Sequence, residues 1–134
     1  MSYQVIESTD KAIGAFLEFF KSEVIANFFE DQFSREEAEF ALTEILNNAH
    51  EHGNKKDSKK KIIIVWEFVH QFLIVSVKDE GFSFEKKSIA LPPLNCTRGR
   101  GLFSVQECEV VETLSLNQKD STVTIFFKKK EDTK

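Results

Sequence analysis

The sequence predicts an α+β fold, a two-layer α/β sandwich in which helices cover one face of a mixed, mostly antiparallel sheet. Near the N-terminus, apolar residues recur at the three-and-four spacing of helices, whereas most segments after residue 60 are rich in β-branched and aromatic residues. The 134 residues are enough for one two-layer core and too few for two. We therefore expect a single domain spanning residues 1–134.

One strand and one helix are expected first. Residues 3–7 form an edge strand, and residues 8–10 offer caps for a helix that runs to about Phe29. Its buried face is formed by Ile13, Phe16, Leu17, Phe20, Val24 and Phe28. The chain holds 14 Phe, which have no polar group, against one Trp and one Tyr. This composition predicts a Phe-packed core with rings left over for a partner surface.

A second helix is expected from Ser34 to about His52. Ser34 and Glu37 have the spacing of a capping box, in which the two side chains bind unpaired backbone N–H groups. Gly53 ends the helix, and residues 55–60 form a charged loop.

The remaining elements are strands and the segments that connect them. Strands are predicted at residues 61–69, 72–77, 110–116 and 122–127. Residues 82–100 are expected to form a flexible lid, because this connection is longer than most within a compact domain. A short helix starts near Gly101, and residues 128–134 form a frayed tail.

Composition narrows the function classes. No apolar run approaches the ~20 residues of a membrane helix, and the N-terminus lacks the features of a secretory signal, so we expect a cytoplasmic protein with no membrane partner. Cys96 and Cys108 are expected to be free thiols. The net charge of -4 argues against a nucleic-acid partner.

Glu44, Asn48 and His52 recur every four residues on the second helix. At ~100° per residue they fall within an arc of ~80° and form one stripe. The neighbouring arc should face the sheet and consists of Ala38, Leu42, Ile45, Leu46 and Ala49, whereas the solvated side carries Glu39, Thr43 and Asn47. Spacing alone favours an ordinary hydrophilic helix face. The downstream segments favour a site.

Two of these downstream segments have the composition of a nucleotide site. The run Asp79-Glu80-Gly81 follows a buried strand, and the run Arg98-Gly99-Arg100-Gly101-Leu102 precedes a helix. Glycines let the backbone approach phosphate oxygens, and a helix N-terminus offers free N–H groups. The two arginines add positive charge to this phosphate-binding loop.

Together these segments resemble the nucleotide-binding motifs of the gyrase, heat-shock chaperone, histidine kinase and MutL (GHKL) ATPase superfamily. Residues 44–54 resemble its N-box, residues 79–81 its adenine loop and residues 98–102 its glycine box. The N-box spacing, which includes His52-Gly53, is most similar to that of the anti-sigma-factor serine kinases. The resemblance spans nearly the whole chain and implies the histidine kinase-like ATPase fold.

The resemblance implies ATP and Mg²⁺ as cofactors. Asn48 would coordinate the metal, Asp79 would accept a hydrogen bond from the adenine amino group, and Glu44 would be the base that orients or deprotonates the attacking hydroxyl. Further nucleotide-binding positions implied in this way are His52, Gly81, Arg98, Gly99, Arg100, Gly101, Leu102 and Thr122.

The resemblance also implies a function in transcription regulation. The protein would be an anti-sigma factor and serine/threonine kinase that phosphorylates a STAS-type anti-sigma-factor antagonist, holds a sigma factor and switches partners with nucleotide state, with a homodimer also expected. The alternative is a non-catalytic interaction module, with or without nucleotide, that sequesters a regulatory partner. Ser83 and Asp120 stand where the family usually has glycine and favour this alternative, whereas Glu44 favours the kinase.

Other site classes fit the sequence less well. His50 and His52 are two residues apart on a helix and point ~200° away from each other, so they do not readily share a metal ion. The chain has no Walker-type phosphate loop and no nucleophile turn with a Ser-His-Asp pattern. A sensor histidine kinase would need a dimerising helical hairpin, and only one helix precedes Ser34.

Overall fold

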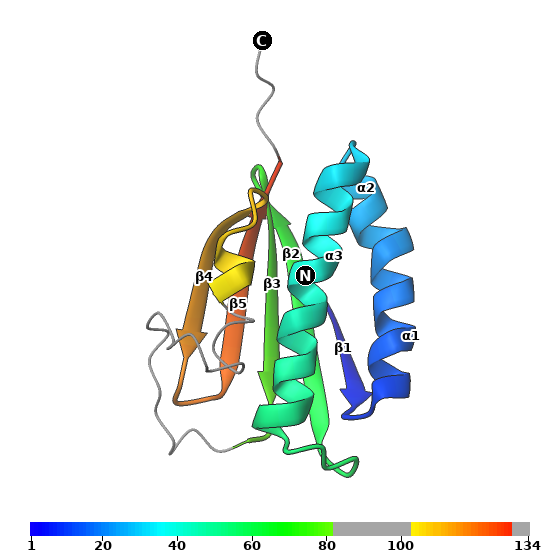
Figure 1. Ribbon diagram of the computed structural model, residues 1–134, viewed down its shortest axis with the longest axis vertical. Coiled ribbons are helices and arrows are strands. Elements are labelled where there is room, and N and C mark those ends of the chain that lie inside the picture. Colours follow the sequence, from blue (N-terminus) through cyan, green and yellow to red (C-terminus); the bar gives the residue numbers. More distant parts are fainter. Residues whose placement is uncertain (82–102, 130–134) are drawn as a thin grey trace.

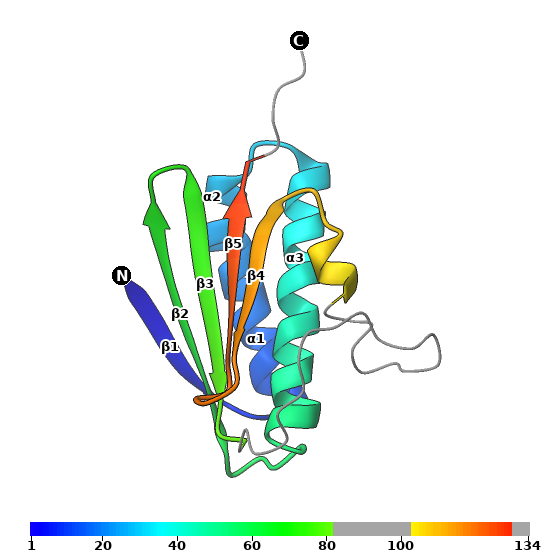
Figure 2. The same ribbon diagram turned by 90° about the vertical axis from the view of Figure 1, so that its left-hand side faces the viewer.

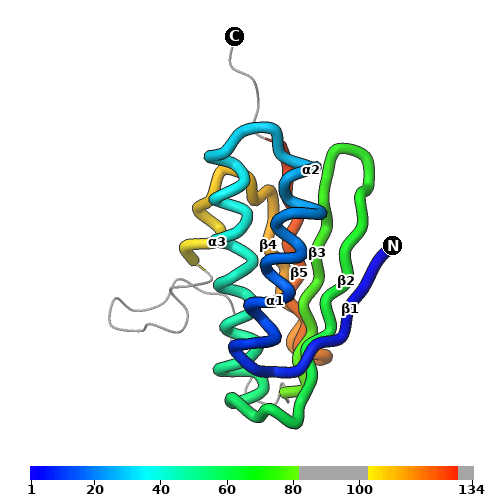
Figure 3. The backbone as a smooth tube through the Cα atoms, turned by 90° about the vertical axis from the view of Figure 1, so that its right-hand side faces the viewer, coloured from blue at the N-terminus to red at the C-terminus, as the bar shows by residue number. Residues whose placement is uncertain are grey.

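The computed structural model describes residues 1–81 and 103–129, which form two layers (Figure 1). Within these residues, one layer is a five-stranded sheet in which every paired strand is antiparallel. The order across the sheet is β1 (Ser2–Glu7), β2 (Lys61–Val69), β3 (Phe72–Asp79), β5 (Thr122–Lys128) and β4 (Val111–Asn117). The helices cover one face of this sheet, as the two side views show (Figures 2 and 3). The predicted α+β sandwich is confirmed.

The first helix is one continuous rod with a wider turn in its middle. It consists of α1 (Asp10–Phe20), the π-helical turn η1 (Lys21–Ile25) and α2 (Ala26–Phe28). Thr9 is the N-cap, and its hydroxyl accepts a hydrogen bond from the Ala12 backbone N–H at 3.0 Å. The predicted helix to about Phe29 and its cap region are therefore confirmed.

The second helix, α3 (Gln32–Asn48), begins earlier than predicted. Its N-cap is Asp31, whose carboxylate accepts a hydrogen bond from the Ser34 backbone N–H at 2.9 Å. The predicted capping box at Ser34 is wrong, because Asp31 already binds that N–H group and Ser34 lies inside the helix, fully buried against the core. Glu37 does not cap the helix either, because its carboxylate accepts a hydrogen bond from the Val110 backbone N–H instead.

The end of the second helix is tied to two strands. After α3 the chain widens into the π-helical turn η2 (Ala49–Gly53) and stops at Asn54, close to the predicted end. The Asn54 side chain is fully buried and donates to the Lys61 carbonyl oxygen at 3.0 Å, while its own oxygen accepts from the Glu80 backbone N–H at 2.8 Å. One carboxamide thus holds the helix end against the start of β2 and the end of β3.

Aromatic rings fill the space between the layers. Phe16 and Phe20 pack on Trp66 of β2, with ring centroids 6.0 and 5.3 Å from the indole. Phe29 packs edge-on against Phe127 of β5 at 6.2 Å. The predicted Phe-rich core is confirmed, and the exposed large apolar residues also include rings: Phe19, Phe33, Phe40, Phe68 and Phe103.

The C-terminal strands differ from the prediction in one place. Lys128 was expected in a frayed tail, but it belongs to β5, where it pairs with Phe72 and its ammonium lies 3.0 Å from the Glu112 carboxylate. The expected lid at 82–100 and residues 130–134 of the tail lie outside the described residues. Residues 103–106 are helical, so the helix predicted near Gly101 is present in its described part. Across the two described stretches, no helix has the length and apolar character needed to span a membrane.

Candidate functional site

The candidate site lies where three chain segments meet at one edge of the molecule. The C-terminal end of the second helix, the end of β3 and the turn from β4 to β5 all lie at the lower edge of Figure 1. They bring together Gly53, Asp79, Gly81 and Ser121, although Gly53 and Ser121 are 68 residues apart in the sequence. The turn η2 contacts β3 directly in this region.

Gly53 and Gly81 are needed here for space. A Cβ atom added to Gly53 would collide with the carboxylate of Asp79, and one added to Gly81 would collide with the backbone carbonyl of Gly53. Neither glycine has a positive φ, so the requirement is steric and not conformational. The missing side chains allow the helix end to lie directly against the Asp79 carboxylate.

Asp79 forms hydrogen bonds through both its carboxylate and its backbone. Its Oδ1 accepts a hydrogen bond from the Gly81 backbone N–H at 2.8 Å, and its own backbone N–H donates to the Ser121 carbonyl oxygen at 3.2 Å. Burial of the half-buried side chain raises the pKa of Asp79 above 3.8, the value of an unperturbed aspartate. The Gly81 N–H, the Ser121 hydroxyl and the positive charge of Lys60 partly offset this rise in pKa.

Ser121 has a strained backbone at the point where it meets this carboxylate. Its φ of 54° lies in the left-handed region that favours glycine. The residue in the conformation typical of glycine is therefore Ser121, directly before Thr122. It is not Asp120, which the resemblance aligned with the glycine that the family usually has. The Ser121 hydroxyl donates to the Gly81 carbonyl oxygen at 2.7 Å and also contacts the Asp79 carboxylate, and its single proton serves one acceptor at a time.

Removal of this hydroxyl is expected to raise the pKa of Asp79 further. In the variant Ser121→Ala the strained backbone is kept, and the carboxylate loses one contact that favours its charged form. Because the pKa of Asp79 is higher in the folded than in the unfolded chain, ionisation of Asp79 lowers stability as the pH rises from about 3.8 to the folded pKa, and this window extends to higher pH in the variant. A carbon-detected NMR titration of the Asp79 carboxyl measures the shift.

The exposed Ser115 of β4 provides the matched control. The variant Ser115→Ala should leave the pKa of Asp79 unchanged. An Asp79 titration in Ser121→Ala that coincides with that of the unaltered protein would remove Ser121 from the site.

The stripe on the second helix lies on the side away from α1. Glu44, Asn48 and Glu37 fall within an arc of about 40° at ~100° per residue, and Glu37 contacts the backbone of Val110, which follows the short helix at 103–106. Glu44 and Asn48 are half-buried on this side. The face predicted to contact the sheet is confirmed: Ala38, Leu42, Ile45, Leu46 and Ala49 are all buried.

The side of the helix predicted to be solvated is only partly so. Glu39, Thr43 and Asn47 are half-buried rather than exposed. Glu39 lies beside the first helix, where its carboxylate is 3.4 Å from the ammonium of Lys21 in η1. The first helix packs along this side, which the spacing of the second helix alone does not reveal.

Asn48 carries the polar atom that fits a ligand best. Its Nδ2 atom is buried and has no hydrogen-bond partner within residues 1–81 and 103–129. Asn48 precedes Gly53 by five residues, or roughly 7 Å along a helix, and Glu44 lies about 6 Å further in the same direction. The Nδ2 group is a hydrogen-bond donor and does not bind a metal, whereas the carboxamide oxygen of Asn48 is the kind of hard oxygen atom that Mg²⁺ prefers.

The remaining predicted positions divide into described and undescribed ones. His52 is half-buried in η2, and Thr122 begins β5 directly after Ser121, so both lie at the same edge as Asp79. The predicted phosphate-binding loop lies outside the described residues: Arg98, Gly99, Arg100, Gly101 and Leu102. Three residues that shape the site had no predicted role in it: Gly53, Asn54 and Ser121. Gly53 and Asn54 belong to the segment that resembles the N-box, but their own positions were interpreted as the helix stop, and a serine gives no signal for a left-handed backbone.

A second polar cluster joins Ser8, His50 and Asp10, the three residue types of a hydrolase triad. The Ser8 hydroxyl lies 2.8 Å from His50 Nδ1, and His50 Nε2 lies 3.8 Å from the Asp10 carboxylate. Ser8 is fully buried, so no substrate reaches its oxygen, and the cluster instead ties η2 to the start of α1. No group of His, Cys, Asp or Glu in the described ranges is arranged to hold a metal ion by itself.

Comparison with known proteins agrees with this geometry at the level of the family. The model of the histidine kinase-like ATPase domain matches residues 6–127 of the chain, from β1 to β5. No curated protein matches. The chain therefore belongs to the histidine kinase-like ATPase domain family, and this membership implies that it binds ATP.

Proposed function

We propose that the protein binds Mg-ATP at this edge and is a serine/threonine kinase of the anti-sigma-factor type. Its phospho-acceptor is a STAS-type anti-sigma-factor antagonist, its other partner is a sigma factor, and it acts as a homodimer. The observation that carries the proposal is the placement of Asp79 against Gly53 at the end of the same helix that bears Asn48 and Glu44.

Asp79 recognises the base in this proposal. One carboxylate oxygen is already engaged by the Gly81 N–H, and an amino group of adenine is the donor that a half-buried carboxylate binds well. Gly53 has no side chain, so the end of the helix lies directly against this carboxylate. The ionised form of Asp79 is the acceptor, so adenine affinity should rise with pH through the raised pKa of this group.

Asn48 and Glu44 act further along the helix. The carboxamide oxygen of Asn48 would hold Mg²⁺, which when bound neutralises charge on the ATP phosphates. Glu44, one turn away, accepts the proton of the attacking serine hydroxyl and orients its oxygen. Phosphoryl transfer needs mainly such positioning and charge neutralisation.

The proposal is tested by incubating the protein with ATP labelled at the γ-phosphate and STAS-type antagonists from the same genome. We expect label on a serine or threonine of one antagonist, and sigma-factor binding that differs between ATP and ADP. Absence of label on every antagonist, with ATP bound, would contradict the kinase and favour the non-catalytic module that sequesters its partner. The observation that favours the non-catalytic module is the left-handed backbone of Ser121, a conformation typical of glycine.

The variant Asp79→Asn is expected to weaken ATP binding by about 10-fold to 100-fold and GTP binding much less. The asparagine side chain has nearly the same volume, but an NH2 group, which donates, replaces one carboxylate oxygen, which accepts. The adenine amino group therefore loses its partner. Calorimetry with both nucleotides gives the comparison, and Asp57→Asn on the exposed loop is the control. Equal losses for ATP and GTP would contradict a contact between Asp79 and adenine.

A further inference from the structure

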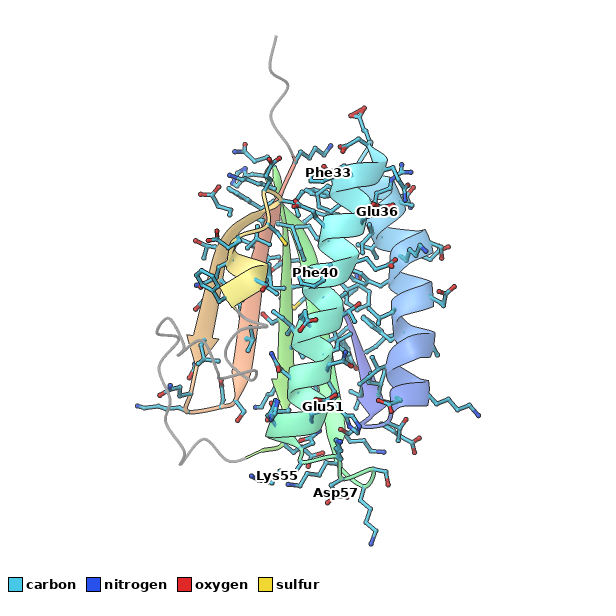
Figure 4. All side chains as sticks on the ribbon, viewed as in Figure 1. Phe33, Glu36, Phe40, Glu51, Lys55 and Asp57 are labelled. Atoms are coloured by element: carbon cyan, nitrogen blue, oxygen red, sulfur yellow. The ribbon has the colours of Figure 1, made fainter. Side chains whose placement is uncertain are left out.

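An open groove runs along the outer side of the second helix, beside the helical segment at 103–106. It has a volume of about 410 Å³. Its lining consists of Phe33, Glu36, Glu37, Phe40, Ser104, Glu107 and Cys108. Phe33, Glu36 and Phe40 point outward from α3 in Figure 4, toward the viewer and away from the sheet.

The groove exposes the surface of two aromatic rings. Phe33 is 49% exposed and Phe40 is 42% exposed, whereas five other Phe side chains of the described residues are buried: Phe16, Phe20, Phe28, Phe29 and Phe127. Transfer of such rings from water into a protein contact is favourable, and adjacent exposed rings are typical of binding surfaces. Both rings belong to one helix, so they form a rigid surface.

The charged side chains that line the groove are all acidic among the residues that the structure describes. Glu36, Glu37 and Glu107 contribute carboxylates, and no described lysine or arginine belongs to the lining. Cys108 adds no reactive group, because burial and, to a smaller extent, the nearby Glu37 carboxylate raise the pKa of its thiol to about 11. The groove is therefore suited to binding and not to chemistry of its own.

One end of the groove, at Phe40, lies one helical turn from the proposed catalytic residue. Phe40 precedes Glu44 by four residues, which is one turn and about 6 Å along α3, and the two positions differ by only about 40° around the helix axis. A protein segment that lies in the groove would therefore approach Glu44 along the helix surface.

We propose that this groove docks the phospho-acceptor protein, through a segment that places an apolar side chain on Phe33 and Phe40 and lysine or arginine against Glu36 and Glu107. The assignment rests on the proposed kinase function and names the surface by which that kinase holds its protein substrate. Charge complementarity selects this occupant, since the carboxylates repel nucleic-acid phosphates and anionic lipids and attract a basic, apolar protein segment.

The test compares charge reversal in the groove with charge reversal elsewhere on the full chain. In the double variant Glu36→Lys/Glu107→Lys, the KM for the antagonist should rise by about 10-fold or more, with the effect shrinking at high salt, while ATP affinity and kcat at saturating antagonist stay unchanged. The control is Glu18→Lys on the exposed side of α1. The variant Phe40→Ala should raise the same KM. The variant Phe68→Ala should not, because Phe68 is 56% exposed but lies beside Phe28 of α2, outside the groove lining.

Calorimetric titration of the antagonist onto each variant separates this inference from the kinase proposal. If the unaltered protein binds the antagonist without transferring phosphate, the kinase proposal fails, and weaker binding to the groove variants still supports the docking surface. If the groove variants and the unaltered protein bind the antagonist equally, or if no antagonist binds, the docking surface is refuted. Loss of sigma-factor binding with an unchanged KM for the antagonist would also overturn the assignment. Thermal unfolding of each variant confirms that it is folded.

Discussion

Replacement of Asn48 by alanine is expected to weaken Mg-ATP binding more than about 100-fold, to the point where calorimetry detects no binding. The carboxamide is the residue proposed to hold the metal, and its buried Nδ2 atom has no hydrogen-bond partner in the described part of the chain. The variant therefore loses no hydrogen bond donated by this Nδ2 group to the described residues. Thermal stability without nucleotide should change by less than about 1 kcal/mol.

Asn47→Ala is the matched control for this variant. Asn47 is also a half-buried asparagine of α3, but it lies about 100° away around the helix and outside the stripe. It should bind Mg-ATP with unaltered affinity. Equal affinity of Asn48→Ala and the unaltered protein would show that Asn48 is not a metal ligand.

Replacement of Glu44 by alanine is expected to leave ATP affinity within about twofold and to lower phosphoryl transfer by about 10²-fold to 10⁴-fold, the usual contribution of a positioned general base. Glu44 lies about 6 Å beyond Asn48 along the helix, on the side away from Asp79 and the proposed base contact. Single-turnover transfer of labelled phosphate to the antagonist measures the loss.

The control is Glu39→Ala, which removes a carboxylate from the opposite side of the same helix, where it pairs with Lys21. This variant should keep both ATP binding and transfer, because an ion pair between partly exposed groups contributes only about 0–1 kcal/mol. If Glu44→Ala labels the antagonist as fast as the unaltered protein does, Glu44 is not the base.

The elements were predictable from the sequence because their signals are local. Apolar spacing predicted that Ala38, Leu42 and Ile45 face the sheet, and β-branched runs predicted the strands that became β2 and β3. The cap of the second helix was not predicted correctly, because Ser34 and Asp31 both have residue types that cap helices. Packing chose between them, since the buried position falls on Ser34.

The candidate site also has a part that local sequence patterns predicted and a part that they did not. Helical periodicity by itself put Glu44 and Asn48 on one stripe, because side chains four residues apart share a face of any α-helix. Only the tertiary structure decided that Gly53 lies against Asp79, that Ser121 adopts the left-handed backbone beside that carboxylate, and that the first helix covers the side of Glu39. These contacts join segments far apart in the chain, and their geometry depends on how whole elements pack, which no local pattern of residues encodes.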